Sequence, residues 1–207
     1  MYKFNFAESF GVYKWCTVFE KENKNSVLFA HITGGEWKSI KNPINKQSIY
    51  NFSLNEKKPD FVIHIDPINV LLLGEAKITL SKLYNDIVKH LNIIQILKKI
   101  FSKKSSAWEN TQSCIVPTFM WCSEKKVSST KDVEKFFNEV KSKYLNNFDS
   151  EDLIVVGLEV LRDENMCLET KSHIFCSKKS EISDKLIKYI KGLSSLGCTI
   201  YNKDYIT

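Results

Sequence analysis

Two apolar segments that lie close together constrain the fold more than any other feature of this chain. They are Phe61–Ile65 (FVIHI) and Val70–Lys77 (VLLLGEAK). Short runs rich in β-branched and aliphatic residues and bounded by turn residues are typical of strands. The four residues between the two runs, 66–69 (DPIN), have the composition of a turn. The sequence therefore predicts a β-hairpin.

Hydrophobic periodicity predicts the other elements around this hairpin. Residues 6–20 have mixed periodicity, which leaves helix and strand open and slightly favours a helix. From residue 80, apolar positions recur at helical spacing and predict a helix to about residue 100. Further strands are expected at 26–33, 49–54, 114–121, 153–161, 167–175 and 199–202, and further helices at 129–144 and 182–196. Pro117 indicates that its strand is an edge strand or carries a bulge, whereas 153–161 is apolar on both faces, as expected of a central strand.

Length and composition set the broad class. Strands alternating with covering helices predict an α/β or α+β domain with a mixed central sheet flanked by helices. At 207 residues and 43% hydrophobic, the chain is expected to form one domain over 1–207. Its six cysteines include no CxxC pair, so reduced core thiols are expected and not a zinc or redox centre. No run of some twenty apolar residues occurs, which predicts a soluble cytoplasmic protein without a membrane partner.

The charge balance permits binding to a polyanion without indicating it. The net charge is +6, but of the 30 basic residues only Arg162 is an arginine. Arginine is the commonest reader of guanine edges. Its near absence would leave any sequence-specific readout of nucleic acid to Lys, Asn, Gln and the main chain.

Three charged residues of the hairpin form the strongest candidate site. Side chains alternate along a strand, so Glu75 and Lys77 share a face, and the turn brings Asp60 back beside them. Two carboxylates next to an ammonium suit the hydrolysis of a phosphodiester with Mg²⁺, which prefers oxygen ligands. Asp60, Glu75 and the Ala76 main-chain carbonyl would hold the metal. Lys77 would position or deprotonate the attacking water, or stabilise the pentavalent phosphorus.

The pattern Pro59-Asp60, fourteen residues, then Glu75-Ala76-Lys77 resembles the motif of the PD-(D/E)xK nuclease superfamily, which includes many restriction endonucleases. The run LLLGEAK before a long amphipathic helix is similar to that superfamily's second motif strand and the helix after it. ExK recurs six more times in this lysine-rich chain, but only the Glu75 copy ends an apolar strand. The resemblance covers about residues 48–122 and implies a restriction-endonuclease-like core.

Other residues could join this site. Gln95 lies on the apolar face of the expected helix and resembles the glutamine or other polar residue that borders the active site in several branches of the superfamily; a plain core glutamine is an equal alternative. Members often add an acid from the first helix, for which Glu8 or Glu20 qualifies. His64 shares the alternation of Asp60, although a lone histidine in a strand is more often a core or surface residue.

The resemblance implies a Mg²⁺-dependent DNA endonuclease, with Mn²⁺ as an alternative ion, and first of all a type II restriction or related defence enzyme. Its implied partners are double-stranded DNA and a second copy of the chain, as a homodimer that cuts both strands. A structure-specific or repair nuclease is the alternative within the enzyme class. The alternative from another class is a nucleic-acid-binding subunit that keeps the nuclease fold without cutting.

Overall fold

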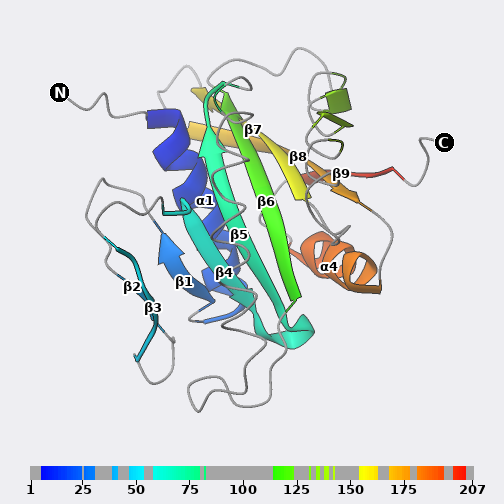
Figure 1. The fold of residues 1–207 in the computed structure, drawn as a ribbon. Helices are drawn as coiled ribbons and strands as arrows, with labels where there is room; N and C mark the ends of the chain where they lie inside the picture. The colour runs from blue at the N-terminus through cyan, green and yellow to red at the C-terminus, as the bar shows by residue number, and fades with distance from the viewer. Residues whose placement is uncertain are drawn as a thin grey trace.

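The chain forms a mixed α/β structure around one central sheet (Figure 1). The computed structural model describes residues 6–24, 26–30, 39–41, 47–53, 58–79, 82, 114–123, 131, 134–135, 138–139, 142, 154–162, 168–177, 181–193 and 198–203. The predicted helix over 80–100, with Gln95, lies outside these residues except for Lys82, which is helical. Of the predicted helix 129–144, the residues described are also helical.

The central sheet has seven strands in the order β1-β4-β5-β6-β7-β8-β9. β5 pairs with β6, β6 with β7 and β8 with β9 in parallel, while the other neighbours are antiparallel. The expectation of a mixed central sheet is therefore confirmed. The strands are β1 (Val27–Ala30), β4 (Phe61–Ile65), β5 (Val70–Lys77), β6 (Cys114–Ser123), β7 (Ile154–Arg162), β8 (Leu168–Ser177) and β9 (Cys198–Lys203).

The predicted hairpin is present as β4 and β5, paired from Phe61↔Gly74 to Ile65↔Val70. A short 3₁₀ turn, η1 (Asp66–Ile68), connects the strands, and Asn69 closes it in the left-handed conformation with φ 53°. Asparagine tolerates this region better than most residues because its short polar side chain can bond locally. The turn thus brings the start of β4 to the end of β5.

Replacing Asn69 should show how much its side chain and backbone geometry stabilise the hairpin. We expect Asn69→Ala to lower the free energy of unfolding by about 1–2 kcal/mol, since alanine is strained in the left-handed region. Asn69→Gly should lose less, because glycine adopts this conformation without strain. Urea unfolding of both variants measures the difference. Equal losses for alanine and glycine would show that backbone conformation is not the cause.

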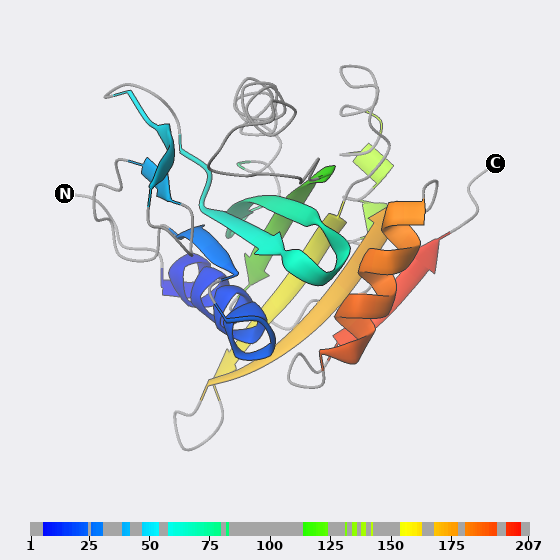
Figure 2. The ribbon, with the colours of Figure 1, turned by 90° about the horizontal axis from the view of Figure 1, so that it is seen from below.

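Two helices pack on one face of the sheet (Figure 2). α1 (Phe6–Glu22) confirms the helical alternative for the N-terminal segment, and α4 (Glu181–Gly192) confirms the last predicted helix over a shorter span. The rings of Phe19 and Tyr189 stack with their centroids 6.3 Å apart, which joins the two helices over the sheet. None of the helices in the described part of the chain is both long and apolar enough to cross a membrane.

The prediction for Pro117 was wrong. Its strand β6 lies inside the sheet between β5 and β7, and Pro117 pairs with Leu73. Among the residues that the structure describes, pairing with β7 begins at Thr118, one residue after Pro117. The central position of the strand predicted at 153–161 is confirmed, because β7 lies between β6 and β8.

A second, two-stranded sheet stands beside the main one. It consists of β2 (Ser39–Lys41) and β3 (Ser48–Asn51), which pair antiparallel. The predicted strand at 49–54 corresponds to β3. In Figure 1 this sheet lies at the outer side of β1 and β4, next to the strand end that carries Asp60.

Candidate functional site

Asp60 is held against the end of β5 by two hydrogen bonds to the main chain of that strand. Its backbone N–H donates to the Gly74 carbonyl oxygen at 2.8 Å, which continues the antiparallel ladder by one residue. Its Oδ2 accepts a hydrogen bond from the Ala76 N–H at 2.6 Å. Asp60 is 8% exposed, so its carboxylate points into the protein and is not a solvated strand cap.

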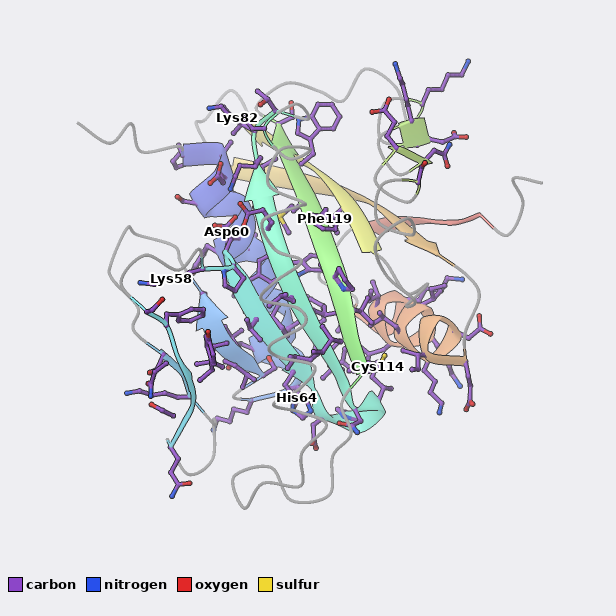
Figure 3. The ribbon with its side chains drawn as sticks, in the orientation of Figure 1. Lys58, Asp60, His64, Lys82, Cys114 and Phe119 are labelled. Atoms are coloured by element: carbon purple, nitrogen blue, oxygen red, sulfur yellow. The ribbon has the colours of Figure 1, made fainter. Side chains whose placement is uncertain are left out.

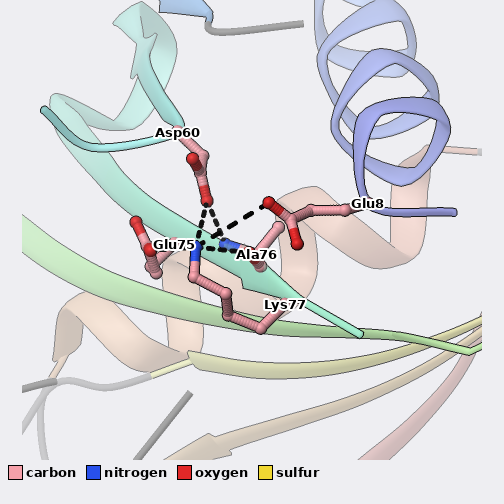
Figure 4. Close-up of polar contacts among 5 residues, drawn as sticks. All are labelled: Glu8, Asp60, Glu75, Ala76 and Lys77. Atoms are coloured by element: carbon pink, nitrogen blue, oxygen red, sulfur yellow. Dashed lines mark hydrogen bonds and ion pairs between the residues drawn. The ribbon is translucent and has the colours of Figure 1, made fainter. Parts of the chain in front are cut away.

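Lys77 brings the hairpin acids into one cluster (Figure 4). Its Nζ lies 3.4 Å from Asp60 Oδ2, donates to the Ala76 carbonyl oxygen at 2.9 Å and forms an ion pair with Glu75. Glu75 is 5% exposed. The structure therefore brings Asp60, Glu75, Ala76 and Lys77 together at one end of the hairpin.

A third carboxylate comes from α1. Glu8 Oε1 lies 3.8 Å from Lys77 Nζ, and Glu8 sits in the first turn of the helix, where a negative charge interacts favourably with the helix dipole. Glu20, the other candidate, accepts a hydrogen bond from the Val27 N–H at 2.7 Å and so supports the start of β1 instead. We refer to Glu8, Asp60, Glu75 and Lys77 as the acid–lysine cluster.

The charges of this cluster are strongly coupled. Burial raises the pKa of Asp60, the neighbouring Glu75 raises it further, and the attraction of Lys77 and the Ala76 hydrogen bond only partly offset this. Burial by itself lowers the pKa of Lys77, but Asp60 and Glu75, with Glu8, outweigh it and raise the pKa overall. Lys77 is therefore a protonated donor at neutral pH in this arrangement. Three acids around one ammonium leave excess negative charge, which favours a further cation.

Gly74 has no side chain, and this permits the close approach of the Phe61 ring to β5 next to Asp60. A Cβ at Gly74 would come within 1.9 Å of the Phe61 ring, which lies directly over it and is fully buried. Phe61 follows Asp60 in the chain, so the ring packing and the Asp60 hydrogen bond to Gly74 form one unit. A glycine inside an apolar strand is the sequence signal for such an approach.

The far side of β5 is tied to β6. Trp121 pairs with Lys77 in the parallel register, and its indole Nε1 donates to the Ile78 carbonyl oxygen at 3.0 Å. This bond orders the chain just after Lys77. Trp121 therefore anchors this end of β5.

Another candidate, His64, lies elsewhere. His64 pairs with Leu71 near the turn end of the hairpin, where its side chain is hydrogen-bonded to that of Asn69, so it does not join the cluster (Figure 3). Burial lowers the pKa of His64. The position of Gln95 is outside the described residues. Cys16 and Cys122 are buried thiols without a disulfide, as predicted for these two.

The residues present fit a hard divalent cation in their chemistry. Three carboxylates and one carbonyl oxygen surround a single point, and oxygen donors are what Mg²⁺ prefers. The ammonium of Lys77 stands at that point. Over the described ranges, no group of three His, Cys, Asp or Glu side chains is arranged to hold a metal as it stands. A bound ion would therefore require the ammonium to move aside.

Comparison with known proteins adds nothing to this geometry: no family model, no curated protein and no solved structure matches the chain.

Proposed function

We propose that this protein is a Mg²⁺-dependent endodeoxyribonuclease with a restriction-endonuclease-like core. The observation that carries the proposal is the buried acid–lysine cluster at the end of β5, where Asp60 and Glu75 are almost fully buried beside Lys77. Burying two carboxylates is expensive unless cations compensate them. A sheet built only for stability has little need of such an arrangement, whereas active sites often contain one.

Each residue of the cluster has a role in the proposed reaction. Asp60, Glu75 and the Ala76 carbonyl would hold Mg²⁺, and Glu8 would add a further carboxylate from α1. When bound, the ion would neutralise the charge that develops on the phosphate oxygens. Lys77, as a donor, would orient the attacking water or bond a phosphate oxygen. The Ala76 N–H keeps Asp60 Oδ2 fixed, which leaves the other oxygen, Oδ1, for the metal.

The proposed biological role is a type II restriction or related defence enzyme that acts as a homodimer on double-stranded DNA. A nuclease that reads backbone shape is the second candidate, and the observation that favours it is the single arginine among 30 basic residues. The two candidates predict different products. A sequence-specific enzyme yields discrete fragments, while a structure-specific enzyme cuts at junctions, flaps or nicks.

Digestion of a defined supercoiled plasmid tests the function directly. We expect cleavage with about 5 mM Mg²⁺ or Mn²⁺ and none in EDTA, because the metal is needed to neutralise the charge that develops on the phosphate oxygens during cleavage. Gel electrophoresis distinguishes discrete fragments from smears or nicks. Cleavage that continues unchanged in EDTA would refute a metal-dependent site. Metal-dependent DNA binding without any cutting would support the non-catalytic alternative instead.

A further inference from the structure

The small sheet of β2 and β3 flanks the acid–lysine cluster without belonging to it. Two contacts lead from this sheet to Lys58: the rings of Tyr50 and Phe52 meet edge to face at 5.1 Å, and Lys58 Nζ lies 5.9 Å from the centre of the Phe52 ring. Lys58 precedes Asp60 by two residues, which span at most about 7 Å of extended chain. Figure 3 shows Lys58 beside Asp60, on the side of β2 and β3. The end of β3 is therefore near the cluster.

The two faces of this sheet differ in character. Ile40 is fully buried and pairs with Tyr50, which is half-buried, so this pair forms the inner face. Asn51 pairs with Ser39 on the opposite face and is exposed, as is Lys41 at the other end of β2. The inner face thus anchors the sheet on the protein, and polar side chains point outward.

The charge of this surface complements a polyanion. In the segments 39–41, 47–53 and 58 there are two lysines and no acidic residue. The adjacent cluster, with its three carboxylates, would repel a phosphate backbone unless positive groups beside it supplied attraction. Lys41 and Lys58 are such groups.

The shape and side chains of this surface also suit a DNA groove. A two-stranded ribbon fits the major groove, and asparagine can form two hydrogen bonds with an adenine edge. The chain has a single arginine, Arg162, so the recognition of base edges would depend on other residue types. An exposed asparagine on a ribbon is one of them. Seryl hydroxyls such as that of Ser48 can contact either bases or phosphates.

We propose that the outer face of the β2–β3 ribbon, together with Lys58, is the surface that holds duplex DNA for the acid–lysine cluster. Lys41 and Lys58 contact phosphates, and Asn51 reaches base edges in the groove. The inference rests on the proposed function, because it names the surface that binds the substrate of that reaction. Ile40, which is fully buried, anchors the inner face of the ribbon on the protein.

Binding can be separated from cutting by measuring it in EDTA. The probe is a fluorescently labelled duplex, taken from a plasmid fragment that the wild-type protein cleaves, and the readout is anisotropy at several salt concentrations. We expect Lys41→Ala and Lys41→Gln to weaken binding about 3–10-fold near 0.1 M salt and to reduce the salt slope by about 1. Asn51→Ala should weaken binding about 10-fold without changing the slope, because it removes a base contact and no charge.

The matched control is Lys188→Ala, which removes one exposed lysine from α4 and should leave binding unchanged. Circular dichroism checks that each variant is folded. If the wild-type protein cuts and binds DNA while the Lys41 and Asn51 variants behave like Lys188→Ala, the ribbon is not the DNA surface, although the nuclease proposal stands. If the wild-type protein neither binds nor cuts DNA, the proposed function itself fails. Tighter binding of duplex RNA than of the DNA probe would overturn the choice of partner.

Discussion

Asp60→Asn should abolish cleavage and at the same time make the protein more stable at neutral pH. The loss of activity, about 10³-fold or more, is expected because the variant removes a charged metal ligand while keeping the shape of the side chain. The gain in stability follows from the position of Asp60. Burial and the neighbouring Glu75 raise its pKa, so ionising it in the folded protein is unfavourable.

The sign of the pH dependence follows from this shift. A carboxyl with a raised pKa in the folded state binds more protons than in the unfolded state, so its ionisation lowers stability as pH rises from its ordinary pKa through the raised one. Below the ordinary pKa the penalty is absent. Asp60→Asn should therefore match the wild-type stability at acidic pH and exceed it by about 1 kcal/mol at neutral pH. Urea unfolding in EDTA between about pH 3 and 8 measures the stability at both ends of this range.

Metal provides a second readout for the same variant. Mg²⁺ that binds only the folded protein should stabilise the wild type by about 2.7 kcal/mol when its concentration is a hundred times the dissociation constant. This stabilisation should raise the melting temperature. The Asp60→Asn variant should show little of this effect. Asp66→Asn is the matched control, since Asp66 is exposed in the turn at the opposite end of the hairpin and should change neither stability nor cleavage. An Asp60→Asn protein that is less stable than the wild type at neutral pH would contradict the electrostatic argument.

Gly74→Ala should strongly destabilise the fold. The added methyl group would overlap the Phe61 ring, and a ring that is fully buried has little room to move. Overpacking of this kind lowers the free energy of unfolding by about 1–3 kcal/mol, occasionally more. Because Asp60 is adjacent to Phe61 and donates to the Gly74 carbonyl, cleavage should fall further than the loss of folded protein explains. Denaturant unfolding and the activity of the folded fraction measure the two effects.

A double-mutant cycle identifies the cause of this loss. Phe61→Leu alone leaves a cavity, but combined with Gly74→Ala it makes room for the new methyl group, so the two effects should not add. The control is Gly192→Ala at the end of α4, where a Cβ meets nothing within 4 Å. That variant should be neutral or slightly stabilising. Additive losses for Phe61→Leu and Gly74→Ala would rule out contact between the ring and the methyl group as the mechanism.

The hairpin and the approach of its charged residues could be predicted from the sequence because both are local. Alternation along β5 places Glu75 and Lys77 on one face, and a turn of four residues returns the chain so that Asp60 meets them. Ala76, to which Asp60 is hydrogen-bonded, lies sixteen positions further along the chain, and only the strand period and the turn length determine that contact. Both the strand period and the turn length can be seen in the order of apolar, polar and turn residues, so the sequence alone predicts such contacts.

Contacts between distant segments were decided by the tertiary structure. The sequence left Glu8 and Glu20 as equal candidates, and the packing of α1 on the sheet selected Glu8 for the cluster while Glu20 bonds Val27. The interior position of Pro117 and the bond from Trp121 to Ile78 depend on which strands become neighbours. Periodicity specifies which face of an element is buried, but the side chain that fills a given place on that face depends on the packing of the whole chain.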